Sequence, residues 1–388
     1  MNDSQKVLLE LIKKSQFGKS DDFIYSDNIN WDSVREEAVH QTVIGIIAQE
    51  IPENIYNSDK IWIDLKNQVN ANTIRYYSAE AELIKLLDKS KVPFVILKGT
   101  SVSIYYKYPL RRVMGDIDFL VPEGWFDKTM DILTDNGYMM VSEHQTIRNI
   151  GLIKNGISYE IHKRFSHEDI DIENYLISGI DNRIIVNIGS LAFPVLPKLP
   201  NGLVLLDHMR NHLQSGLGLR QVVDWMMYVN TELTDDFWCK EFSSVVDSLG
   251  LTRFSIVVTR MCQLYLGLSD NITWCKSADD DVCRKLLDLI FQSGNFGCKT
   301  GKGMSVELVR SQIREYGLFR WLQIAGEHNW KAYNRYAWLK PLCWIYQLFR
   351  YSIQGIKSGR AYSELSDDLE RSKNRYELMK ELEISFDD

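Results

Sequence analysis

Apolar residues recur at helical spacing at both ends of the chain. Amphipathic patterns occupy residues 4–15, 31–50 and 59–90, and apolar positions three and four residues apart are typical of a helix with one buried face. Beyond a break at Leu199-Pro200-Asn201-Gly202, the same spacing returns over residues 203–213, 218–230, 236–247, 251–266, 279–292 and 305–327. These patterns predict a helical region on each side of a different central segment.

The middle of the chain changes to short, dense apolar runs. Residues 92–97 form such a run and end at Lys98-Gly99, which favours a buried strand. The turn sequence Asn155-Gly156 between two extended runs is typical of a β-hairpin. Further strands are predicted over residues 115–121, 138–142, 149–154 and 157–165, and helices over 100–107 and 125–135.

These elements predict an α+β fold with a small mixed sheet. We expect three parts: an N-terminal helical region over residues 1–90, an α/β core over residues 91–200, and a C-terminal helical domain over residues 201–388.

Two carboxylates stand two residues apart in the predicted strand 115–121. Asp116 and Asp118 would project from one face, because side chains at i and i+2 of a strand point the same way. Adjacent carboxylates repel each other unless a positive charge lies between them. A divalent cation, Mg²⁺ or Mn²⁺, is the expected partner, since Mg²⁺ takes oxygen ligands. The alternative is a surface strand whose acids face water.

Composition limits the possible partners. The 388 residues carry a net charge of −7, which argues against a broad nucleic-acid-binding surface but not against a local basic patch. Six cysteines without a CxxC pair favour reduced thiols in a cytoplasmic protein. No signal peptide and no transmembrane segment is predicted. The aromatic residues Trp344, Tyr346, Phe349 and Tyr351 predict a core helix, with a weak membrane-surface contact as the alternative.

The order of these motifs resembles the nucleotidyltransferase superfamily that includes DNA polymerase β. The closer resemblance is to an uncharacterised bacterial nucleotidyltransferase family often found near polysaccharide genes. It rests on short motifs between about residues 90 and 230: Leu97-Lys98-Gly99, Tyr108-Pro109, Arg112, Gly115 to Val121, Gly137-Tyr138, Glu160-Ile161-His162, His208 and Gly218 to Asp224.

The resemblance implies a metal-dependent transfer of a nucleoside monophosphate from an NTP to a hydroxyl group. The acceptor would be a small molecule, a sugar or a protein, and a role in polysaccharide biosynthesis is implied by the same family. Asp116, Asp118 and Glu160 would be the catalytic and metal-binding carboxylates, with Glu160 also a candidate base. The metals that these three carboxylates bind would activate the acceptor hydroxyl and stabilise the departing pyrophosphate.

The resemblance also implies a nucleotide-binding turn. The superfamily usually has Gly-Ser after the first strand, whereas this chain has Lys98-Gly99, followed by Thr100. Glycine allows the backbone to approach a phosphate, and Arg112 could bind phosphate oxygens as a guanidinium. The alternative for Arg112 is a solvated turn.

Several polar residues have a structural and a functional interpretation. His162 shares the face of Glu160 and could touch substrate or form a hydrogen bond at the sheet end. His208 and His212 lie four residues apart, where packing or hydrogen bonding is favoured over metal binding. Arg220 and Asp224 have the same spacing and could pair with each other, and the resemblance suggests that they hold the helical domain against the sheet.

The sequence leaves two alternative functions to consider. The altered phosphate turn is compatible with a catalytically inactive scaffold or binding protein that keeps the fold. A template-free polymerase or an RNA-modifying enzyme is disfavoured by the acidic pI of about 5.6 and by the lack of a basic stripe.

Overall fold

The N-terminal part of the chain is helical, as predicted. The computed structural model describes residues 1–18, 29–58, 60–145, 148–165, 170–300, 317–330, 337–347, 349–350 and 373–384. The continuous helix expected over residues 31–50 is interrupted, because Thr42 adopts a left-handed backbone with φ of 57°. The N-terminal helices are α1 (Asp3–Phe17), α2 (Trp31–His40), α3 (Ile44–Ile47), α4 (Glu53–Ser58) and α5 (Lys60–Lys89).

The middle of the chain forms a seven-stranded sheet. The expected strands and the helix after Trp125 are present, and the helix after Lys98 is shorter than predicted. A helix and two strands that the sequence pattern did not reveal follow residue 169. The elements are β1 (Val95–Leu97), α6 (Gly99–Ser103), η1 (Pro109–Arg111), β2 (Ile117–Leu120), η2 (Glu123–Trp125), α7 (Phe126–Asp135), β3 (Met139–Gln145), β4 (Asn149–Lys154), β5 (Ile157–His162), α8 (Ile170–Asp181), β6 (Ile184–Ile188) and β7 (Leu191–Val195).

The sheet is mixed, and its order is β3-β4-β5-β2-β1-β7-β6. The strand β2 is antiparallel to β1 and parallel to β5. The predicted hairpin joins β4 to β5, and Asn155 and Gly156 have φ of 51° and 68°, as a type I′ turn requires. The predicted α+β fold with a mixed sheet is therefore confirmed.

The C-terminal helices begin earlier than expected, at Lys198 rather than residue 203. Pro200 lies in the first turn of α9, where its missing N–H costs no helical hydrogen bond. The elements are α9 (Lys198–Ser215), α10 (Leu219–Thr231), α11 (Asp235–Phe237), the π-helical η3 (Trp238–Phe242), α12 (Ser243–Ser248), α13 (Thr252–Leu266), α14 (Asp280–Ser293), η4 (Asn295–Thr300), α16 (Leu318–Asn329) and η5 (Ala337–Leu342).

The last predicted elements are only partly described. The expected helix 305–327 is described only from residue 317 onward. Tyr351 of the predicted core helix also lies outside the described residues. Phe349 is 68% exposed, so the predicted core position is wrong for this residue. Among the described residues, no helix is both long and apolar enough to cross a membrane.

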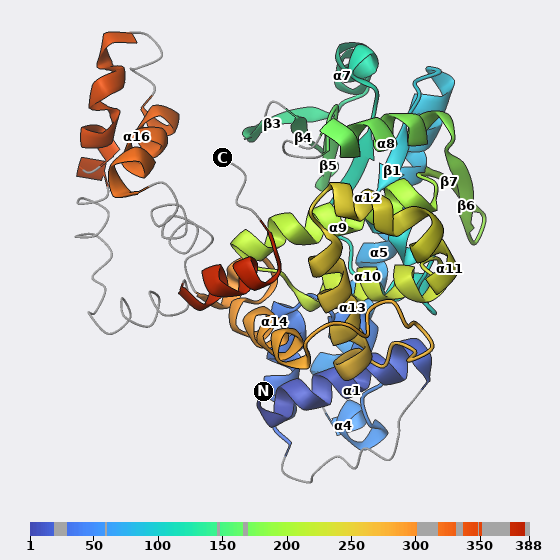
Figure 1. Cartoon of the computed structure of the whole chain (residues 1–388). Coiled ribbons are helices and arrows are strands. Elements are labelled where there is room, and N and C mark those ends of the chain that lie inside the picture. Colours follow the sequence, from blue (N-terminus) through green and yellow to red (C-terminus); the bar gives the residue numbers. More distant parts are fainter. Residues whose placement is uncertain are drawn as a thin grey trace.

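Two apolar clusters lie on opposite faces of the sheet. The first cluster includes Ile117 and Phe119 of β2 with residues of α5 and α7. The second includes Leu97 and Leu120 with residues of α9, α10, α13 and α1. Figure 1 shows the strands at one end of the molecule and α1, α13 and α14 at the other, with α9 and α10 between them. Because side chains alternate along a strand, Asp118 faces the second cluster together with Leu120.

Candidate active site

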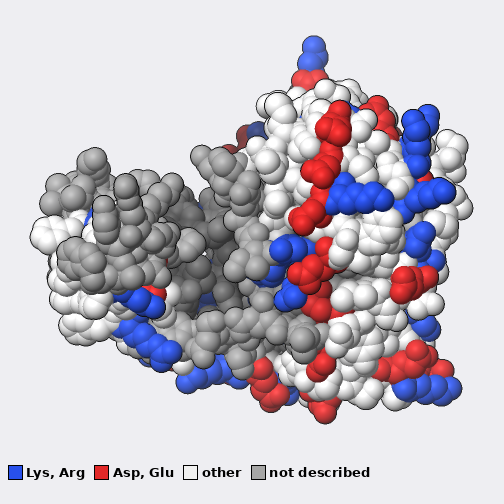
Figure 2. Space-filling model, turned by 90° about the horizontal axis from the view of Figure 1, so that it is seen from above, with Lys and Arg blue, Asp and Glu red and all other residues white. Residues whose placement is uncertain are grey.

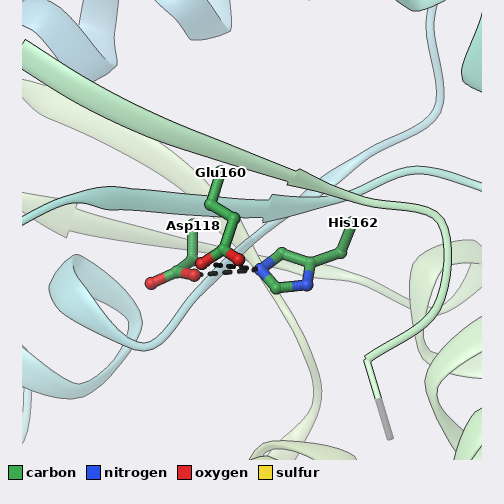
Figure 3. Close-up of side chains that lie close together, drawn as sticks. All are labelled: Asp118, Glu160 and His162. Carbon is green, nitrogen blue, oxygen red and sulfur yellow. Dashed lines mark hydrogen bonds and ion pairs between the residues drawn. The ribbon is translucent and has the colours of Figure 1, made fainter. Parts of the chain in front are cut away.

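The register of two parallel strands brings two carboxylates and an imidazole together. Asp118 of β2 is the partner of Glu160 of β5, and Leu120 is the partner of His162. The His162 Nε2 atom lies 2.9 Å from Asp118 Oδ1 and 3.7 Å from Glu160 Oε2. Figure 3 shows the three side chains pointing toward one another from the two strands. One ligand atom from each residue falls within 4.8 Å of the others, so the three could hold one metal ion.

Asp116 lies next to this cluster but outside it. It precedes the first residue of β2, and its backbone neighbour Gly115 accepts a 2.6 Å hydrogen bond from the Tyr76 hydroxyl. Asp116 lines the same cavity as Asp118 and Glu160. The nearby Asp118 carboxylate raises the pKa of Asp116. The grouping therefore differs from the expected Asp116–Asp118–Glu160 set, with His162 beside the two strand carboxylates.

Lys98 supplies the positive charge that the paired carboxylates require. Its Nζ atom lies 2.8 Å from Asp118 Oδ1, and its backbone adopts a left-handed φ of 47° at the end of β1. Burial opposes ionisation of Asp118, but Lys98 and the hydrogen bond from His162 outweigh it and hold the pKa of Asp118 well below its usual range. The negative charge of Asp118 is thus balanced by Lys98 and by the hydrogen bond from His162.

The predicted nucleotide-binding turn separates into a cavity-lining part and a structural part. Lys98 and Gly99 line the cavity, and Gly99 has φ of 32°. Thr100 is fully buried, and its hydroxyl donates a hydrogen bond to the Glu80 carboxyl group of α5. The side chain of Thr100 is therefore directed at α5 rather than at the cavity.

Arg112 forms a buried ion pair with Asp224 of α10. Its Nε and Nη2 atoms donate to the two Asp224 oxygens, each at 2.7 Å, and the Tyr106 hydroxyl donates to the same carboxylate at 2.5 Å. The expected Arg220–Asp224 pair is wrong, because Arg112 occupies both oxygens of Asp224. Arg220 instead donates to the Val113 carbonyl at 3.4 Å. The contact joins α10 to the segment that precedes β2, as the resemblance suggested for this helix.

Two histidines of α9 line the same cavity as the carboxylates. The Nε2 atoms of His208 and His212 lie 2.9 Å apart and share a hydrogen bond, which confirms the hydrogen-bonded interpretation of the pair. Burial and the charge of Lys98 lower both pKa values, that of His212 to about 3. The pair is therefore neutral at neutral pH.

The carboxylates and the histidines line one cavity of about 220 Å³. Its lysine and arginine residues are Lys98, Arg112, Arg148, Arg164 and Arg220, and its acids are Asp116, Asp118 and Glu160. Of these cations, Arg148 and Arg164 were not identified from the sequence. Arg164 lies two residues after His162, so extending the strand alternation by one step would have pointed to it.

A family model described as an uncharacterised nucleotidyltransferase matches residues 27–267. The chain belongs to this nucleotidyltransferase family. The match includes every residue of the cavity named so far, and it ends before η4. One similar solved structure is an antigenic nucleotidyltransferase-like protein from Paracoccidioides brasiliensis, with 14% sequence identity, a TM-score of 0.31, and coverage of 50% of this chain and 92% of that chain. No match was found among curated proteins.

Proposed function

We propose that the protein is a metal-dependent nucleotidyltransferase that moves a nucleoside monophosphate from an NTP to a hydroxyl acceptor. The observation that carries the proposal is the meeting of Asp118, Glu160 and His162 in a cavity that also contains five lysine and arginine residues. Carboxylates suited to a metal and cations suited to phosphate are the two requirements of nucleotidyl transfer.

The donor set fits a divalent cation. Asp118 and Glu160 offer oxygen atoms and His162 offers a nitrogen, while Asp116 could add a further oxygen from the same cavity. Carboxylates suit Mg²⁺ and Mn²⁺, and an imidazole ligand favours a transition metal over Mg²⁺. The bound metal would orient the triphosphate and neutralise developing charge on the departing pyrophosphate.

The residues of the chain would contribute binding and proton transfer. Lys98, Arg148, Arg164 and Arg220 would bind phosphate oxygens, with Gly99 allowing close approach of the backbone. The predicted phosphate contact of Arg112 is not part of the proposal, because both Asp224 oxygens accept hydrogen bonds from its guanidinium. The acceptor oxygen would form a bond to the α-phosphorus while the bond to the β-phosphate oxygen breaks. Burial and the Asp118 charge raise the pKa of Glu160, which suits this carboxylate to take the proton of the acceptor hydroxyl.

Calorimetric titration of each NTP, with and without Mg²⁺ or Mn²⁺, tests the proposal. We expect metal-dependent binding by the wild type and at least about tenfold weaker binding by Asp118→Asn, because this change removes a charged ligand. Asp131→Asn is the matched control, since Asp131 is an exposed carboxylate of α7. Equal metal-dependent affinity of Asp118→Asn and the wild type would contradict the assigned site.

A catalytically inactive binding protein is the second candidate. The observation that favours it is the ion pair between Lys98 and Asp118, which balances the carboxylate without a metal. Pyrophosphate release in the presence of candidate acceptors separates the two functions. Nucleotide binding without release under any condition would support the inactive protein.

Neither candidate function identifies the acceptor substrate. A small molecule, a sugar or a protein hydroxyl fits the proposed reaction, and a role in polysaccharide biosynthesis and a cytoplasmic location remain predictions from the sequence. On the face shown in Figure 2, acidic and basic side chains are interspersed. This arrangement supports a small substrate over an extended nucleic acid.

A further inference from the structure

We propose that Phe296 is the platform on which the nucleobase of the NTP stacks. The inference rests on the proposed nucleotide-binding function and adds a base-binding subsite to it. Phe296 belongs to η4 and lies beyond residues 27–267, which the family model matches. The subsite would therefore be a feature of the C-terminal part of this chain.

The first observation is the position of the ring. Phe296 lines the same cavity as the carboxylates and Lys98, yet 48% of the residue is exposed. Its ring contacts His212 edge-on at a centroid distance of 4.7 Å, and His212 contacts His208 in the same way at 4.4 Å. Three rings thus form a continuous wall that ends in an accessible aromatic residue.

The second observation is the backbone that holds the ring there. Phe296 has φ of 55° and ψ of 27°, a left-handed conformation that is costly for a bulky residue and natural for glycine. Phe296 N–H donates to the Gly216 carbonyl at 3.0 Å. A Cβ atom at Gly216 would lie 2.1 Å from Gly297 N, so the two segments touch through glycines. A strained, exposed aromatic residue at a cavity indicates a functional constraint on the side chain.

The third observation is the size and charge of the cavity. Its volume of about 220 Å³ is below the roughly 300–1,000 Å³ of sites that enclose a whole drug-sized ligand. The cavity lining carries the cations and carboxylates that suit a triphosphate, and among them Asp118 is buried and Lys98 is largely buried. The base would then project toward the mouth, where Phe296 offers a π-face that every nucleobase can use.

The test compares a ligand that carries a nucleobase with a ligand that lacks one. Each NTP and inorganic tripolyphosphate, with Mn²⁺ or Mg²⁺, would be titrated into the wild type, Phe296→Gly and Phe296→Tyr. Glycine suits the left-handed backbone, so Phe296→Gly should fold and keep its melting temperature. Phe319→Ala is the control, because Phe319 of α16 is 68% exposed and does not line the cavity.

We expect Phe296→Gly to weaken NTP binding by between about fivefold and one hundredfold, in line with the loss of one stacked base. Tripolyphosphate affinity should change by less than about twofold, and Phe296→Tyr should retain NTP affinity. Unchanged NTP affinity in Phe296→Gly, or an equal loss for both ligands, would overturn the platform. Failure of the wild type to bind either ligand would instead reject the proposed function and the subsite with it.

Discussion

Glu80 lies buried beneath the turn that carries Lys98 and Gly99. The residue is 1% exposed and accepts the hydrogen bond from Thr100. Burial raises its pKa from 4.5 to about 8. Between these two values the folded protein holds a proton that the unfolded chain has released. Glu80 therefore contributes stability that is complete below pH 4.5 and is lost as the pH rises through 8.

We expect Glu80→Gln to reduce the loss of stability at alkaline pH. Between pH 5.5 and pH 9, the wild type should lose on the order of 3 kcal/mol of unfolding free energy through this group. Urea denaturation at both values measures the difference. Glu82→Gln is the control, since Glu82 is an exposed residue of the same helix. If the unfolding free energies of Glu80→Gln and the wild type changed in parallel with pH, Glu80 would be ionised in the folded protein.

Single residues of the site could be predicted only where local spacing fixes the geometry. The alternation of β5 placed Glu160 and His162 on one face, and the structure has them there. The contact of both residues with Asp118 depends on the pairing of β2 with β5, which links positions about 40 residues apart. Lys98 could be associated with phosphate from its turn, but its ion pair with Asp118 needs a left-handed backbone that the sequence does not reveal.

At the scale of elements, the Arg112–Asp224 ion pair joins α10 to the turn before β2. Both side chains are almost completely buried, at 4% and 5% exposure. Loss of one partner leaves an uncompensated charge in the interior, which typically costs more than the intact pair contributes. The pair thus fixes how the C-terminal helices lie on the sheet.

We expect Asp224→Leu to lower the unfolding free energy by about 3–5 kcal/mol. The double variant Arg112→Met, Asp224→Leu should lose less than the sum of the single changes, because no buried charge is left alone. Urea denaturation of the four proteins gives this coupling. Arg284→Met provides the comparison, since the Arg284–Asp281 pair is more than half exposed and should contribute much less than the buried pair. Additive losses in the double variant would contradict the proposed coupling.

Elements with strong local signals were predicted well, and the strands β6 and β7 were missed. The long helix α5 and the Asn155-Gly156 hairpin follow from periodicity and turn chemistry. The strand β6 has exposed Ile184 and Ile185 at the sheet edge, so its apolar residues do not alternate as a half-buried strand would. Its partner β7 contains Pro194, a residue that argues against a strand. The exposed position of β6 at the sheet edge and the proline of β7 therefore hid these two strands from sequence patterns.

At the scale of the whole molecule, the two ends of the chain share one apolar cluster. Leu8 and Leu11 of α1 belong to the same cluster as residues of α13 and as Leu378 and Met379 near the C-terminus. The three parts predicted from the sequence as residues 1–90, 91–200 and 201–388 thus have apolar contacts across their boundaries. The division itself remains a prediction.

We expect Leu11→Ala to destabilise helices at both ends of the chain. Leu11 is fully buried, and such a change typically costs about 2–5 kcal/mol. Hydrogen exchange should accelerate in α13 and α14 as well as in α1, because the helices share their core. Val39→Ala is the control, with Val39 being 49% exposed. Faster exchange confined to residues 1–90 would indicate an independent N-terminal domain.

The charge distribution has a kinetic consequence. The chain has a net charge of −7, whereas five lysine and arginine residues and only three acidic residues line the cavity. A short polyanion meets this local field at the mouth, whereas a long one also lies along a surface on which acidic and basic side chains are interspersed and gains little further attraction. Encounter with a nucleotide should therefore be fast at low ionic strength, and slower as salt shortens the screening distance to about 8 Å at 0.15 M. The molecule would select its ligand by length before any chemical contact is made.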